Sequence, residues 1–128
     1  MSGRLSDEEL LARADAAAAG AYAPYSRFHV GCAVLARDGR VIEGVNVENA
    51  SYPLGVCAER TALARAVAEG YRPGDFAAAA ITASPCGGCR QWLLELQVPY
   101  VVFRNGGRVV TMRPDELLPE SFEASDLP

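Results

Sequence analysis

Two segments, Cys57-Ala58-Glu59-Arg60 and Pro85-Cys86-Gly87-Gly88-Cys89-Arg90, tell the most about how this chain folds. Together they carry three thiols with the spacing of metal ligands. Two cysteines in the first turn of a helix place both sulfurs on one face, and a third thiol from another segment completes three corners of a tetrahedron. The fold is therefore expected to bring these two segments together.

Three protein ligands leave one position of a tetrahedral metal open. An open position distinguishes a catalytic zinc from a structural one, because it can hold a water whose pKa falls to about 7. Glu59 follows the first thiol closely, where a carboxylate is suited to proton transfer. Arg60 and Arg90 each either donate hydrogen bonds to the sulfurs or are ordinary surface charges.

The composition favours one soluble domain over residues 1–128. The chain has 128 residues, of which 50% are hydrophobic, and this is enough for a core of its own. We expect a cytoplasmic protein with reduced cysteines, because the sequence shows neither a signal-peptide pattern nor an apolar run that spans a membrane. A formal net charge of -4 argues against a nucleic-acid partner and favours a small molecule.

Helices and strands are expected to alternate along the chain. Ser6 followed by three acidic residues is a helix-capping signal, and Asp38-Gly39 and Asn105-Gly106-Gly107 are hairpin turns. We expect helices from about Asp7 to Ala21, Cys57 to Glu69, Cys86 to Leu96 and from Pro114, and strands over Phe28–Ala36, Val41–Val47, Phe76–Ala83, Tyr100–Arg104 and Arg108–Met112.

This order predicts an α/β fold, a three-layer α/β/α sandwich with a mixed five-stranded sheet. The first two strands and the last two strands are expected to be antiparallel neighbours. The strand, helix, strand, helix, strand order in the middle implies right-handed crossovers and parallel neighbours. The thiols then lie at two helix N-termini, where unsatisfied N–H groups stabilise thiolates.

The Cys-Ala-Glu and Pro-Cys-x-x-Cys pair resembles the signature of the zinc-dependent deaminases. Three further segments are similar in order and spacing to the small cytidine deaminases: Ala23–Phe28, Asn46–Pro53 and Leu117–Phe122. That resemblance covers nearly the whole chain. Cysteine at the first ligand position is typical of this small form, which acts on free nucleosides as a homotetramer, and not of the RNA- and DNA-editing relatives.

The resemblance implies hydrolytic deamination of cytidine and 2′-deoxycytidine to uridine and 2′-deoxyuridine plus ammonia, in pyrimidine salvage. One Zn²⁺ per subunit would be held by Cys57, Cys86 and Cys89, with a zinc-bound hydroxide as nucleophile. Glu59 would carry the proton, and Arg60 would support the sulfurs. Further residues are implied to bind the nucleoside, the last two from a neighbouring subunit: Phe28, Asn46, Glu48, Ala58, Ser84, Tyr52 and Phe122.

Other functions remain open at this point. The Pro85–Cys89 segment also resembles the redox motif of a thiol-disulfide oxidoreductase, although that function leaves Cys57 and Glu59 without a role. A non-catalytic zinc site with Cys32 as fourth ligand is a second alternative. Among deaminases, one that acts on a cytosine-nucleoside antibiotic such as blasticidin S is the closest alternative.

Several aromatic residues also have a simpler interpretation. Phe28 and Val30 lie on the same face of an expected strand, so the alternative interpretation of Phe28 is a core residue. Tyr52 and Phe122 are alternatively ordinary surface aromatics. The only histidine, His29, is expected to face solvent or an interface rather than a metal.

Overall fold

The fold is organised around one five-stranded mixed sheet with strands in the order β2-β1-β3-β4-β5. It is seen in a computed structural model that describes residues 5–128. In chain order the elements are α1 (Asp7–Ala18), β1 (Gly31–Ala36), β2 (Val41–Val45), the 3₁₀-helix η1 (Tyr52–Leu54), α2 (Ala58–Ala68), β3 (Phe76–Ile81), α3 (Gly87–Glu95), β4 (Val101–Asn105), β5 (Arg108–Met112), α4 (Pro114–Leu117) and the 3₁₀-helix η2 (Ala124–Asp126).

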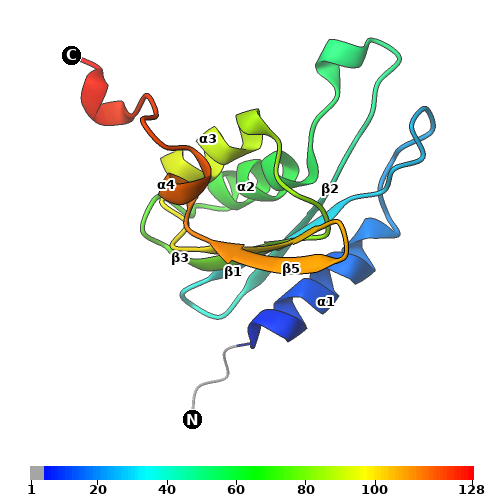
Figure 1. The fold of residues 1–128 in the computed structure, drawn as a ribbon, viewed down its shortest axis with the longest axis horizontal. Helices are drawn as coiled ribbons and strands as arrows, with labels where there is room; N and C mark the ends of the chain where they lie inside the picture. Colours follow the sequence, from blue (N-terminus) through cyan, green and yellow to red (C-terminus); the bar gives the residue numbers. More distant parts are fainter. Residues whose placement is uncertain (1–4) are drawn as a thin grey trace.

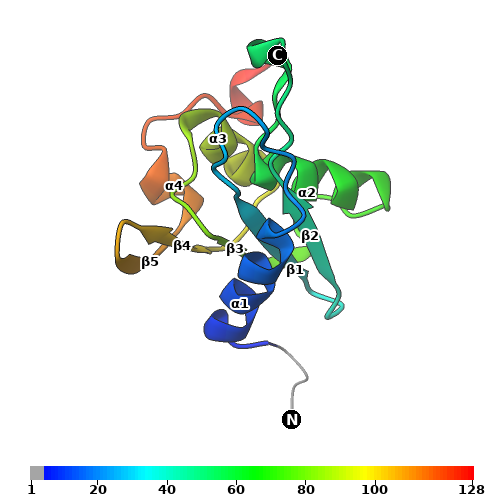
Figure 2. The same cartoon turned by 90° about the vertical axis from the view of Figure 1, so that its right-hand side faces the viewer.

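Helices cover both faces of the sheet, which confirms the three-layer α/β/α sandwich. Figure 1 shows α1 on one side of the sheet and α2 and α3 on the other, and the turned view in Figure 2 shows the same division. The buried residues form two clusters that follow this division: Leu10 and Leu11 of α1 pack in one, and Leu63 of α2 and Leu93 of α3 pack in the other. The central strands β1 and β3 are buried along their whole length.

The strand pairing agrees with the sequence prediction in most respects and corrects it in one. The β1/β2 and β4/β5 hairpins are antiparallel, and β3 and β4 are parallel neighbours, as expected. The prediction that the strands joined through α2 are also neighbours is wrong, because β1 lies between β2 and β3 and pairs antiparallel with both. β2 and β3 still run in the same direction.

Two predicted boundaries are wrong by three residues. α1 ends at Ala18 rather than Ala21, because the following N–H groups bond three residues back and tighten the chain into a 3₁₀-like turn. β1 begins at Gly31 rather than Phe28. The side chain of Asn46 replaces a partner strand there: its Oδ1 accepts from the Val30 N–H at 2.8 Å, and its Nδ2 donates to the Phe28 carbonyl at 2.8 Å.

Two glycines let the helices lie directly on the sheet. A Cβ on Gly31 would meet the carbonyl oxygen of Ala14 in α1 at 2.0 Å, and a Cβ on Gly44 would meet the backbone nitrogen of Ala62 in α2 at 2.4 Å. Thr61 adds a polar link between α2 and β2, because its hydroxyl donates to the Val45 carbonyl and accepts from the Val45 N–H. The start of α2 is thereby fixed against the sheet.

No helix within residues 5–128 is long and apolar enough to cross a membrane.

Candidate metal centre and active site

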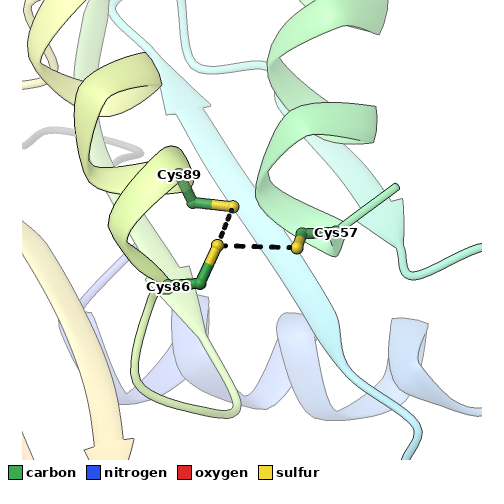
Figure 3. Close-up of side chains that lie close together, drawn as sticks. All are labelled: Cys57, Cys86 and Cys89. Carbon is green, nitrogen blue, oxygen red and sulfur yellow. Dashed lines mark hydrogen bonds between the residues drawn. The ribbon is translucent and has the colours of Figure 1, made fainter. Parts of the chain in front are cut away.

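Three cysteine side chains meet where α2 and α3 begin. Cys57 is the N-cap residue of α2, Cys86 is the N-cap residue of α3, and Cys89 lies in the first turn of α3. The Sγ atom of Cys86 lies 3.7 Å from that of Cys57 and 3.3 Å from that of Cys89 (Figure 3). All three sulfurs are within 4.8 Å of one another. The structure thus brings together the three predicted metal ligands.

The arrangement of the sulfurs fits a tetrahedral zinc ion. With Zn–S bonds of about 2.3 Å, two ligands of a tetrahedral site lie about 3.8 Å apart. The Cys57–Cys86 separation of 3.7 Å agrees with that spacing, and the 3.3 Å between Cys86 and Cys89 is somewhat shorter. All three thiols are free rather than paired in disulfides. Cys32 is buried in β1 and, within the described residues, does not belong to this sulfur cluster.

Positive charge faces the sulfur cluster from α2. Arg60 follows Cys57 by nearly one helical turn, and its Nη2 donates to Cys57 Sγ at 3.8 Å. The hydrogen bond to Cys57 raises the pKa of Arg60 above its usual value, so the guanidinium stays charged beside the thiol. Arg60 Nε is buried and, within residues 5–128, has no hydrogen-bond partner. The predicted contact between Arg60 and the sulfurs is present in the structure.

Arg90 has a role that the sequence did not predict. Within residues 5–128 it has no hydrogen bond to a sulfur; it donates instead to the carbonyl oxygens of Pro85 at 2.9 Å and Leu117 at 3.0 Å, and to the hydroxyl of Ser84 at 3.3 Å. It therefore ties the loop before Cys86 to the end of α4. The spacing of Arg90 after a cysteine gave no signal for this, because Leu117 is distant in the sequence.

Glu59 is the one charged residue that is buried within the described part of the chain, with 3% of its surface exposed. It stands in the first turn of α2, between Cys57 and Arg60 in the sequence. Burial raises the pKa of its carboxyl group, and a hydrogen bond with the Cys89 thiol partly opposes that shift. A buried carboxyl with a raised pKa beside a metal site is suited to accept and return a proton.

A cavity of about 410 Å³ lies between the loop after α1 and the segment around η1. Its lining residues are Tyr25, Ser26, Glu48, Asn49, Tyr52 and Gly55. Among the predicted nucleoside contacts, this lining includes Glu48 and Tyr52. Within the described residues it includes neither the thiols nor Asn46, so one chain does not gather all predicted contacts around a single cavity.

The remaining predicted contacts lie in different surroundings. Ala58 is fully buried in the first turn of α2, and Ser84 is exposed in the loop before Cys86. Phe28 is 62% exposed, which contradicts its alternative as a core residue. Phe122 is 60% exposed, and its carbonyl accepts from Gln91 Nε2 of α3 at 2.8 Å. His29 is exposed, as expected.

The sequence matches a known family model over residues 5–105, which is described as the zinc-binding region of cytidine and deoxycytidylate deaminases. The chain belongs to the cytidine and deoxycytidylate deaminase family. This family is one of zinc-dependent hydrolases, and the three-thiol cluster with Glu59 falls inside the matched region. The predicted zinc cofactor therefore agrees with both the family and the geometry.

Individual relatives in this family match the chain over nearly its whole length. A cytidine deaminase of Halalkalibacterium halodurans is 46% identical over 127 residues, covering 92% of this chain and 95% of that protein. A cytidine deaminase of Mycobacterium tuberculosis is 43% identical and covers 93% of this chain and 91% of its own length.

Solved structures of family members have the same fold. The crystal structure of cytidine deaminase from Burkholderia pseudomallei superimposes with a TM-score of 0.87 at 48% identity, covering 92% of this chain and 100% of that chain. The crystal structure of cytidine deaminase from Mycobacterium tuberculosis gives a TM-score of 0.79 at 41% identity, covering 92% of this chain and 98% of that chain. The predicted α/β fold of the cytidine deaminase type is thereby confirmed.

Proposed function

We propose that this enzyme converts cytidine and 2′-deoxycytidine, with water, to uridine and 2′-deoxyuridine plus ammonia. The observation that carries the proposal is the three-thiol cluster with a buried glutamate beside it, in a chain whose relatives are cytidine deaminases. An oxidoreductase would use the Cys86 and Cys89 pair alone. The deaminase proposal gives Cys57, Glu59 and Arg60 a role as well.

The chemistry divides between one metal ion per subunit and Glu59. A zinc ion held by Cys57, Cys86 and Cys89 would lower the pKa of a water toward neutrality and so supply the nucleophile at C4 of the pyrimidine. The Glu59 carboxylate takes one proton from the water and delivers it to the ring nitrogen N3. It then carries the second proton, from the new C4 hydroxyl, to the departing amine. The C4–N bond breaks and ammonia leaves, so atoms and charge balance.

The residues around this centre orient the nucleoside in our proposal. Phe28 lies against the pyrimidine face. The Asn46 amide forms hydrogen bonds with the ribose hydroxyls, and the Glu48 carboxylate accepts hydrogen bonds from them. Backbone groups of Ala58 and the loop residue Ser84 bind the amide-like edge of the base. The N–H groups at the start of α2 are available for such contacts, because the first turn of a helix leaves them without intrahelical partners.

We further propose a homotetramer whose active sites are shared between subunits. Tyr52 and Phe122, which are 76% and 60% exposed in the single chain, would each contact the nucleoside in a neighbouring subunit's site. Exposed large apolar side chains on one chain favour burial against another. Figure 1 shows the segment around η1 and the C-terminal tail projecting beyond α2 and α3 and diverging to the right and the left, so that each is accessible to another subunit. We place this single-domain enzyme in cytoplasmic pyrimidine salvage.

A panel of substrates tests the proposed function. The zinc-loaded protein is incubated separately with cytidine, 2′-deoxycytidine, cytosine, deoxycytidine monophosphate and blasticidin S, and ammonia release is measured. We expect the two free nucleosides to be converted with kcat/KM at least about 100-fold above the other three. Preferred turnover of blasticidin S would replace the proposal by the antibiotic deaminase, and preferred turnover of the monophosphate would replace it by a nucleotide deaminase.

A further inference from the structure

The carboxylate of Glu48 is held by the same segment that carries Phe28. Glu48 Oε1 accepts from the backbone N–H of Tyr25 at 2.9 Å and from that of Ser26 at 3.1 Å. Glu48 Oε2 accepts from the hydroxyl of Ser26. The Ser26 hydroxyl in turn accepts from the Phe28 N–H at 3.0 Å. One serine therefore connects the two side chains that we place on the ribose and on the base.

The hydrogen bonds of Ser26 have a fixed direction. A serine hydroxyl has one proton to donate, and its oxygen accepts from other donors. The oxygen of Ser26 faces the N–H of Phe28, which cannot accept, so its proton is directed to Glu48. Glu48 is consequently bound as an ionised acceptor, in agreement with the lowering of its carboxyl pKa by the Ser26 hydroxyl and N–H.

The Glu48 carboxylate keeps part of its acceptor capacity for a ligand. A carboxylate offers about four lone-pair sites, two on each oxygen. Two protein N–H groups use both sites of Oε1, and the Ser26 hydroxyl uses one of the two on Oε2. Among the partners that residues 5–128 supply, none takes the remaining acceptor site, which lies on Oε2. Both Ser26 and Glu48 line the 410 Å³ cavity, so a ligand in it can reach this oxygen.

The segment is also held at its other end. Asn46 binds the Phe28 carbonyl and the Val30 N–H, at 2.8 Å each. Residues 25–30 are thus anchored by the Glu48 carboxylate, the Ser26 hydroxyl and the Asn46 amide. Side-chain anchors at both ends reduce the freedom of an exposed loop, and a preorganised loop loses less entropy when a ligand binds.

We propose that Ser26 is a positioning residue that fixes Glu48 so that its Oε2 accepts a single hydroxyl group of the substrate sugar. This inference rests on the proposed function, because it concerns how the nucleoside is selected. Ser26 itself acts through Glu48 and does not need to touch the sugar. The hydroxyl concerned is one on the sugar ring, so nucleosides that lack the 2′- and 3′-hydroxyls gain nothing from this arrangement, and Ser26 contributes to specificity.

Substitutions of Ser26 test the proposal when cytidine and 2′,3′-dideoxycytidine are compared. Ser26→Ala is expected to raise KM for cytidine about tenfold, because it removes a hydrogen bond to a charged group. The kcat is expected to stay within about twofold of the wild-type value. For dideoxycytidine the rise is expected to stay below about threefold. Ser26→Thr, which keeps the hydroxyl, should restore cytidine binding, and the exposed Ser125→Ala is the matched control.

A double-mutant cycle shows whether Ser26 acts through Glu48. In a Glu48→Ala background, adding Ser26→Ala is expected to change KM by less than about twofold. An equal loss for both nucleosides, or full additivity with Glu48→Ala, overturns the proposal.

Amide hydrogen exchange supplies a readout without nucleoside. Ser26→Ala is expected to speed exchange at the Tyr25 N–H about tenfold, because the carboxylate that accepts from it loses an anchor. Unchanged exchange contradicts the positioning role, whereas a wild-type chain that leaves cytidine intact contradicts the proposed function instead. The two failures are therefore distinguishable.

Discussion

Replacing Glu59 by Gln is expected to lower kcat for cytidine by about three to four orders of magnitude while the protein keeps its zinc. The Gln side chain has nearly the same shape but cannot take a proton from water and return it to the pyrimidine. Glu59 contributes no thiol to the metal cluster, so its substitution leaves all three ligands in place. The measurement pairs cytidine turnover with zinc content by atomic absorption.

The matched control for Glu59 is Glu95→Gln, an exposed glutamate at the end of α3. That variant is expected to keep wild-type turnover and zinc. If Glu59→Gln retains more than about a tenth of the wild-type kcat, Glu59 has no part in proton transfer. If Glu59→Gln loses its zinc, Glu59 contributes to metal binding, and our assignment of Glu59 to a role outside the metal cluster is wrong. The loss of activity would then follow from the loss of zinc and not from the loss of proton transfer.

The second large effect is expected from the buried cysteines. Cys89 and Cys32 are both 0% exposed, yet only Cys89 lies within the sulfur cluster of the described residues. Cys89→Ala is expected to abolish turnover and to weaken zinc binding by well over about 100-fold. Loss of a residue that only hydrogen-bonds to a metal ligand costs roughly 10- to 100-fold in metal affinity, and loss of a ligand itself costs more. Cys32→Ala is expected to keep one zinc per chain and full activity.

A competition titration with a chromogenic chelator compares the two variants, and circular dichroism shows that each is folded. Zinc loss in Cys32→Ala would support a closed site with four thiols and would contradict an open catalytic position. Wild-type zinc affinity in Cys89→Ala would remove Cys89 from the ligand set.

The sequence was sufficient for the metal cluster and for most of the fold, because these depend on local signals. Cys57 and Cys86 were predicted at helix starts, and the structure has both as N-cap residues. The turns at Asp38-Gly39 and Asn105-Gly106-Gly107 defined the two hairpins correctly. Such signals depend on residues that are close in the chain, so they are readable without tertiary structure.

The position of β1 between β2 and β3 was missed, although a usable signal was present. β1 has the uninterrupted apolar sequence Gly31–Ala36 and is buried on both faces, as a central strand requires. β2 carries Glu43 and alternates between buried and partly exposed residues, as an edge strand does. Comparing these two patterns would have placed β1 in the interior of the sheet.

The support of the loop that we expect to bind the nucleoside had no comparable signal. Asn46 and Glu48 bind backbone groups of residues 25–30, which are 16 to 23 positions away. A side chain that binds distant backbone leaves no periodic pattern in the sequence. Glu48 was therefore predicted only as a sugar contact, whereas the structure shows that it also holds the loop.

Stepwise addition of zinc to the metal-free protein, with cytidine turnover measured at each step, tests the central claim most directly. Loss of cytidine absorbance and release of ammonia report the reaction. We predict that activity rises linearly with zinc and reaches its plateau at one zinc per chain, because the three thiols lie in a single cluster that could hold one ion. Turnover by the metal-free protein, or one bound zinc per chain with no conversion of cytidine to uridine, would contradict the account.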